Sequence, residues 1–124
     1  MEYNIPLFDL NFGEEEIKAV TDTIRSRWIS TGPRCEELEN LFVSMLDVKY
    51  AVSLSNCTDA LHLACLVCGI GPGDEVLCPS LTFAASVNCI RYVGATPVFC
   101  DIVGPDHINI DPVDIEKKIT ERTK

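Results

Sequence analysis

The chain has 124 residues, 47% of them hydrophobic, which suffices for one domain with a buried core. Its formal net charge of −9 excludes the basic surface that nucleic-acid binding requires, so no nucleic-acid partner is expected. No run approaches the roughly eighteen apolar residues of a membrane span, and the start lacks the basic segment of a signal peptide.

The first 48 residues predict an N-terminal helical segment. Apolar residues recur at helical spacing over 14–27, with acidic side chains in the first turn and basic ones in the last. The stretch 30–33, Ser-Thr-Gly-Pro, breaks this helix. Residues 35–46 then show a second apolar stripe, which predicts a second helix.

Residues 49–124 predict a βαβαβα unit. The predicted strands are 50–54, 75–78 and 98–102, and the predicted helices are 60–68, 83–92 and a last one that starts at Asp111-Pro112. Spacers of helix length predict parallel strands, so the fold class is α/β, a three-layer, mostly parallel sheet with flanking helices. Three strands leave an open sheet edge. We therefore expect the front part of a larger fold that associates through this edge.

The turn after the first predicted strand, residues 55–59, predicts an anion site. A strand that runs directly into a helix leaves the first backbone N–H groups without partners, at the positive end of the helix dipole. Small polar residues let a phosphate or carboxylate approach these groups, and the Thr58 hydroxyl adds a donor. An ordinary helix cap produces the same local pattern, so both interpretations stay open.

A second turn lies at the same end of the predicted sheet, where ligands of open parallel sheets bind. It carries Phe83, and an aromatic ring beside an anion site suits a flat phosphorylated cofactor. Phe83 as a core residue is the alternative. Asp101, at the end of the third predicted strand, is either a polar neighbour of the site or a turn residue.

The seven cysteines show no disulfide-scaffold spacing and lie mostly in apolar segments. This favours reduced cysteines that act as small hydrophobic residues in a cytoplasmic protein. The pair Cys65-x-x-Cys68 has metal-like spacing, but it lies within a predicted helix and lacks a second pair, so no metal site is expected.

Several blocks, in order along nearly the whole chain, resemble the DegT/DnrJ/EryC1/StrS family of PLP-dependent nucleotide-sugar aminotransferases. They are WISTGPRCEELE (28–39), YAVSLSNCTDALHLA (50–64), GPGDEV (71–76), PSLTFAASVN (79–88), GATPVFCDI (94–102) and INIDPVDIEKKITERTK (108–124). The resemblance implies the N-terminal portion of the aspartate-aminotransferase (fold type I) large domain, truncated, with pyridoxal 5'-phosphate (PLP) as the cofactor of the full-length enzyme.

The resemblance also implies roles for individual residues. The implied cofactor-binding residues are Cys57, Thr58, Asp59 and Phe83: backbone amides at 58 and 59 would hold the phosphate, and the aromatic ring would stack on the pyridine. Position 57 is glycine in many members, so this turn is slightly less open here. The implied substrate residues are Trp28, Thr31 and Gly32, in an N-terminal loop near the substrate.

The function implied is transfer of an amino group, usually from glutamate, to a nucleotide-linked keto-sugar, for cell-surface polysaccharide or secondary-metabolite biosynthesis. The family's Schiff-base lysine would lie beyond Lys124, so this chain alone is expected to contain no catalytic residue and to be inactive. A homodimer is expected. Two alternatives stay open: a PLP-dependent sugar dehydratase of the same fold, with histidine in place of that lysine, and a truncated non-catalytic homologue that associates with a full-length partner.

Overall fold

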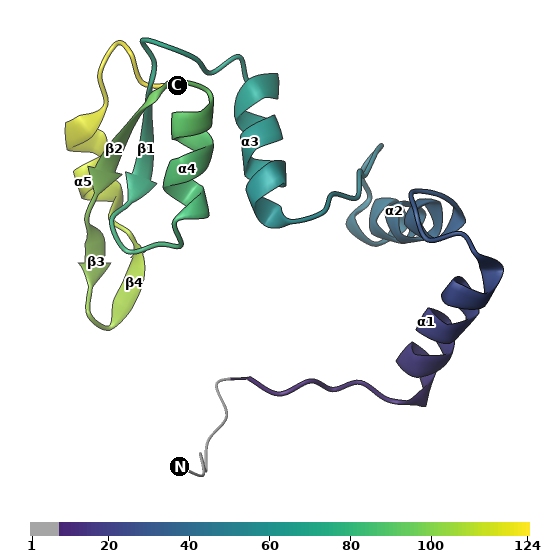
Figure 1. The fold of residues 1–124 in the computed structure, drawn as a ribbon. Helices are drawn as coiled ribbons and strands as arrows, with labels where there is room; N and C mark the ends of the chain where they lie inside the picture. The colour runs from purple at the N-terminus through teal and green to yellow at the C-terminus, as the bar shows by residue number, and fades with distance from the viewer. Residues whose placement is uncertain (1–7) are drawn as a thin grey trace. The chain divides into compact units, whose positions relative to one another are not determined.

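The computed structural model describes residues 8–124 and forms two compact units, Met1–Ser53 (the first unit) and Leu54–Lys124 (the second unit). The first unit contains α1 (Glu14–Ser26) and α2 (Pro33–Leu46) (Figure 1). Proline fits the first position of α2 because a backbone N–H at that position would have no acceptor within the helix, so its absence costs nothing. Both predicted helices are confirmed. Neither of them contains a buried residue.

The predicted first strand, residues 50–54, does not form. Tyr50 and Val52 are 74% and 76% exposed, and the backbone is irregular. A strand needs a neighbour to take its hydrogen bonds, and no described strand pairs with this segment. Glu39 tethers the end of this segment within the first unit, because its carboxylate accepts from the Ser53 N–H (2.7 Å) and hydroxyl (2.8 Å).

The second unit follows the predicted alternation from its first helix onward. Its elements are α3 (Cys57–Val67), β1 (Glu75–Pro79), α4 (Ala85–Tyr92), β2 (Thr96–Cys100), β3 (Ile102–Gly104), β4 (His107–Ile110) and α5 (Pro112–Lys118). Strands β1 and β2 are parallel, with Glu75 opposite Thr96 and Pro79 opposite Cys100. Helices α4 and α5 cover opposite faces of this sheet, and α3 lies beside α4 (Figure 1). The α/β class and the parallel pairing are confirmed.

Two features of the predicted sheet are wrong. The parallel sheet of the described residues has two strands and not three, because residues 50–54 do not join it. The predicted loop after β2 contains an antiparallel hairpin, β3–β4, with Gly104 opposite His107. Pro105 and Asp106 form its two-residue connection, a length that suits a tight β-turn.

The core of the second unit consists of small and branched apolar side chains, namely Cys65, Cys78, Cys89, Ile90, Val93 and Ala95. Small residues allow α3 and α4 to approach each other and the sheet closely. Ile90 is 2% exposed and Cys100 is fully buried. All seven cysteines, which lie between residues 35 and 100, are free thiols. Burial raises the pKa of the Cys65, Cys78 and Cys100 thiols, which keeps them protonated and unreactive.

The outer edges of β1 and β2 have different partners. Beside β1, the Glu75 N–H donates to the Arg122 carbonyl (2.8 Å), and the Lys124 N–H donates to the Glu75 carbonyl (3.0 Å). Glu75 is only 8% exposed. Its carboxylate pairs with the Arg122 guanidinium and accepts from the Thr120 hydroxyl at 2.6 Å. This buried carboxylate therefore attaches the last residues of the chain to the start of β1.

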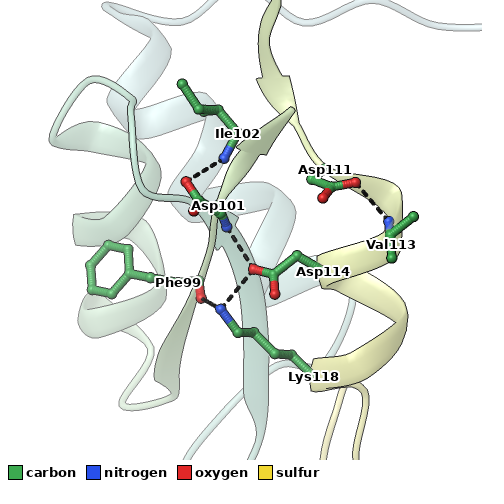
Figure 2. Close-up of polar contacts among 7 residues, drawn as sticks. All are labelled: Phe99, Asp101, Ile102, Asp111, Val113, Asp114 and Lys118. Atoms are coloured by element: carbon green, nitrogen blue, oxygen red, sulfur yellow. Dashed lines mark hydrogen bonds and ion pairs between the residues drawn. The ribbon is translucent and has the colours of Figure 1, made fainter. Parts of the chain in front are cut away.

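The outer edge of β2 is occupied differently. Thr96 donates to the Asp74 carbonyl and Cys100 accepts from the Ser80 N–H, so these two residues face β1. Because successive residues of a strand alternate in direction, Pro97 and Phe99 face outward. Pro97 has no N–H to offer. The Phe99 carbonyl accepts from Lys118 Nζ at 2.8 Å (Figure 2).

Candidate functional site

The start of α3 forms a polar corner, residues 55–59, which we call the phosphate corner. The helix begins at Cys57, three residues earlier than predicted. Asn56 is its N-cap, and its side-chain oxygen accepts from the Asp59 N–H at 2.9 Å. The N–H groups of Cys57 and Thr58 have no protein acceptor among residues 8–124. Two oriented donors therefore remain open at the positive end of the helix.

Side chains of the corner hold one another in place. The Asp59 carboxylate accepts from the Ser55 hydroxyl and from Asn56 Nδ2, the latter at 2.9 Å. Cys57 is exposed and Thr58 is half-buried. The Asp59 N–H, one of the two amides implied by the resemblance, is already bonded to Asn56. Asn three residues before Asp was the sequence signal for this cap.

Phe83 lies just before α4, which begins at Ala85 and not at residue 83 as predicted. Its ring is not part of the core, because the residue is 80% exposed. Helices α3 and α4 both start at the edge of the sheet where β1 and β2 end (Figure 1). Phe83 and the phosphate corner thus belong to the same end of the second unit, which is where open parallel sheets bind ligands.

Asp101 serves the local backbone. Its carboxylate accepts from the Ile102 N–H (2.8 Å), and its own N–H donates to the Asp114 carboxylate (2.7 Å), as Figure 2 shows. Asp111 likewise caps α5 by accepting from the Val113 N–H. Asp101 therefore holds the turn that leads from β2 into β3.

Lys118 is held as a cation. Its Nζ lies 2.7 Å from Asp114 Oδ2, and this hydrogen bond raises the lysine's pKa. The same bond, followed by the one from the Asp101 amide, lowers the pKa of Asp114. An amine acts as a nucleophile only when it is uncharged, so this lysine is unsuited to covalent catalysis.

The implied substrate residues form a tight turn in the first unit. Trp28 Nε1 donates to the Thr31 carbonyl at 3.0 Å, and the indole lies against Gly32. Trp28 is 58% exposed. A hollow of about 570 Å³ adjoins the turn, and its lining includes Trp28, Ser30 and Arg34.

No helix within residues 8–124 is both long and apolar enough to cross a membrane. No group of three or more histidine, cysteine, aspartate or glutamate side chains in the same residues is arranged to hold a metal ion. Cys65 is buried in the core, whereas Cys68 is exposed.

Comparison with known proteins decides the family. The model of the DegT/DnrJ/EryC1/StrS aminotransferase family matches residues 11–124. The chain belongs to this family. A similar relative is the spore coat polysaccharide biosynthesis protein SpsC of Bacillus subtilis (strain 168), which is 46% identical over all of this chain and 31% of its own length.

Two further family members extend the comparison. The UDP-4-amino-4-deoxy-L-arabinose–oxoglutarate aminotransferase of Shewanella sediminis is 48% identical over 97% of this chain and 31% of its own length. Spr1654 from Streptococcus pneumoniae, described as a sugar aminotransferase, is 43% identical with a TM-score of 0.89, over 98% of this chain and 31% of that chain. Its structure is known in PLP and PMP forms. The chain therefore spans about a third of the length of these relatives.

The phosphate corner fits the phosphate group of PLP. A phosphate dianion requires several donors in a positive field, and the Cys57 and Thr58 amides supply two at a helix N-terminus. The Thr58 hydroxyl can supply a third donor. Phe83 offers an aromatic face that no core contact occupies. The observed residues are thus compatible with the cofactor found in the solved relatives.

Proposed function

We propose that this chain forms the N-terminal part of the cofactor-binding domain of a PLP-dependent aminotransferase that converts a nucleotide-linked keto-sugar to an amino-sugar. The amino donor we propose is glutamate. The observation that carries the proposal is the pair of open amides at the start of α3, in a chain that belongs to this family. The names of two relatives, a polysaccharide biosynthesis protein and a UDP-sugar aminotransferase, support the substrate class and a role in polysaccharide biosynthesis.

The chain's own residues would bind and orient the cofactor. When bound, PLP supplies an electron sink for moving an amino group between donor and acceptor. The Cys57 and Thr58 amides would fix its phosphate, and Phe83 would restrict the tilt of its ring. Asn56 and Ser55 would keep the corner in shape by holding the Asp59 carboxylate. We propose no catalytic residue within these 124 positions. Lys118, which is paired and charged, is unsuited to that role.

The test is to remove one donor of the corner and leave its helix intact. Proline is well tolerated at the first position of a helix, and Asn56 before it is extended, as proline requires. In the protein expressed from its natural reading frame, Cys57→Pro should weaken PLP binding about tenfold or more, because a hydrogen bond to a charged group contributes about 1.5–3 kcal/mol. Equilibrium dialysis with PLP measures this change.

Two matched variants serve as controls. Cys57→Ser retains the amide and should bind PLP like the wild type. Glu14→Pro places proline at the first position of α1, after the extended Gly13, and should also leave PLP binding unchanged. The wild type should form 2-oxoglutarate from glutamate when a nucleotide-linked keto-sugar is present. A wild type that binds no PLP would contradict the proposed function.

We also propose that the protein is cytoplasmic and self-associates as a homodimer. Seven free thiols between residues 35 and 100 support a reducing compartment. The apolar face of α1 supports association, because Ile17, Val20 and Ile24 are each at least 58% exposed. Analytical ultracentrifugation should show a dimer at micromolar concentration. A stable monomer would argue against this proposal.

A further inference from the structure

We propose that Glu39 is a positioning residue for the phosphate of PLP, because it fixes the backbone from which the chain enters the phosphate corner. The inference rests on the proposed function, since it concerns the same cofactor site. It assigns a task to a side chain of α2 to which the family resemblance assigns none. Glu39 acts through Ser53 and not by touching the cofactor.

The first observation is a pair of hydrogen bonds on one carboxylate oxygen. Glu39 Oε1 accepts from the Ser53 N–H at 2.7 Å and from the Ser53 hydroxyl at 2.8 Å. The Ser53 amide, followed by its hydroxyl, lowers the pKa of Glu39, so the acceptor is a carboxylate at neutral pH. Hydrogen bonds to an ionised acceptor are roughly twice as strong as neutral ones. Because one donor belongs to the backbone, the direction of the Ser53 peptide group is fixed as well as its position.

The second observation is that Glu39 differs from the neighbouring glutamates of α2. Glu36 and Glu37 are exposed, whereas Glu39 and its partner Ser53 are half-buried. Glu37 pairs with Arg34 on the same helix at 2.8 Å. The partner of Glu39 is instead 14 residues further along the chain. Glu39 therefore joins α2 to a different segment, and its partial burial shields the bonds from screening by salt.

The third observation is the path of the chain between these two residues. Helix α2 ends at Leu46, and its C-cap Asp47 is left-handed, with φ 51°. To reach Glu39 again, the chain runs back along α2 by about two helical turns, or roughly 10 Å. Only Leu54 then separates Ser53 from the phosphate corner. The residue that Glu39 holds is therefore nearly adjacent to the corner in the chain.

The contact matters because the segment before the corner lacks the hydrogen bonds of a strand. Residues 50–54 pair with no described strand, so no sheet ladder sets the direction in which the chain enters the corner. Without Glu39, Ser53 and Leu54 would sample many backbone conformations. The open amides of Cys57 and Thr58 would then have to be ordered when the phosphate binds, and this ordering weakens binding.

The experiment compares PLP with pyridoxal, which lacks the phosphate, in the protein expressed from its natural reading frame. Glu39→Ala should weaken PLP binding about tenfold, since misplaced positioning groups can cost up to about a hundredfold. Binding of pyridoxal should be unchanged, because this ligand has no phosphate for the corner to hold. Equilibrium dialysis measures both dissociation constants. A merely structural role of Glu39 would weaken the binding of both ligands alike.

Three further variants sharpen the result. Glu39→Gln retains the oxygen that accepts both bonds and should bind PLP nearly as tightly as the wild type. Ser53→Ala loses the hydroxyl but retains the N–H, so its effect should be smaller than that of Glu39→Ala and absent in the Glu39→Ala background. Glu37→Ala, the matched control, removes a carboxylate of α2 that pairs with Arg34 and should change neither dissociation constant.

The outcomes are separable. If Glu39→Ala binds PLP as tightly as the wild type, or weakens PLP and pyridoxal by the same factor, the inference is overturned and the proposed function stands. A loss in Glu39→Gln as large as that in Glu39→Ala would also overturn it. Should Glu39→Ala fail to fold, Ser53→Ala with the same two ligands decides in its place. If the wild type binds no PLP, both proposals fail.

Discussion

The helices of the two units bury very different amounts of surface. Helix α1 has a regular apolar stripe, yet Ile24 on that stripe is 64% exposed, whereas Ile90 in α4 is 2% exposed. Both residues lie in amphipathic helices, and the sequence patterns look alike. The difference lies in what is available to cover them: α4 has the sheet and α3, both within the second unit.

This contrast shows what an apolar stripe means. It indicates which face of a helix is suited to burial, and it does not indicate that the covering surface belongs to the same stretch of chain. The chain spans about a third of the length of its relatives, and apolar side chains of α1 are exposed within the described residues. Three comparisons between matched substitutions test and sharpen the contrast.

The largest effect is expected from the two isoleucines. Ile90→Ala should lower the free energy of unfolding by about 2–5 kcal/mol, because it leaves a cavity in the core. In protein dilute enough to be monomeric, where no second copy covers the α1 face, Ile24→Ala should change it by no more than about 0.5 kcal/mol, as exposed substitutions usually do. Urea unfolding followed by circular dichroism measures both. An Ile24 cost as large as that of Ile90 would show that the α1 face is covered in solution.

An intermediate effect is expected from the buried carboxylate of the second unit. Glu75→Gln should lower the free energy of unfolding by about 1–2 kcal/mol, since it loses the charge that the Arg122 guanidinium pairs with. Glu15→Gln, in the exposed first turn of α1, should stay within about 0.5 kcal/mol. The same urea experiment applies. A gain in stability would mean that the desolvation penalty of the Glu75 carboxylate exceeds the stabilisation from its ion pair and hydrogen bond.

The smallest effect is expected from the pH dependence of stability. The Lys118 ammonium lowers the pKa of Asp114, so this carboxylate stabilises the fold above its unfolded pKa, about 4, and the stability is lost as pH falls through the folded value. The raised pKa of Lys118 contributes stability that is lost as pH rises through its folded value. Asp114→Asn should therefore flatten the acid limb of a stability–pH curve.

The first unit offers the matching carboxylate. The Ser53 amide, followed by its hydroxyl, lowers the pKa of Glu39. Glu39→Gln should flatten the acid limb in the same direction, and Asp106→Asn, in the hairpin turn, should leave it unchanged. Thermal unfolding scanned from pH 3 to 7 compares the three variants; an acid limb unaltered by Asp114→Asn would contradict the pairing with Lys118.

Local signals in the sequence were sufficient for most of the second unit. Pro112 after Asp111 identified the start of α5, and the spacing of apolar runs identified β1 and β2 as parallel neighbours. The hairpin was missed although Ile102–Gly104 and His107–Ile110 flank a two-residue connection, which is a hairpin signal. The early start of α3 was missed because all of residues 55–59 were assigned to the turn, whereas the helix already begins after its cap, Asn56.

The candidate site was predictable only in part. The phosphate corner was predictable from a strand-to-helix pattern. Strand formation at residues 50–54, however, depends on a neighbouring strand that no local pattern specifies. The contact between the Trp28 ring and Gly32 also lies outside sequence reasoning. It depends on a rotamer and on the path of the turn, and neither is encoded in residue spacing.

The outer edge of β2 has a consequence for the behaviour of the protein in crowded solution. Exposed strand edges invite a second chain to extend the sheet, which is how many aggregates start. Pro97 has no hydrogen to donate there, and the Phe99 carbonyl is already bound to Lys118. A neighbouring copy therefore finds few free backbone N–H and C=O groups to pair with along the outer edge of β2. Strand-to-strand growth, if it occurs, should proceed from the β1 side.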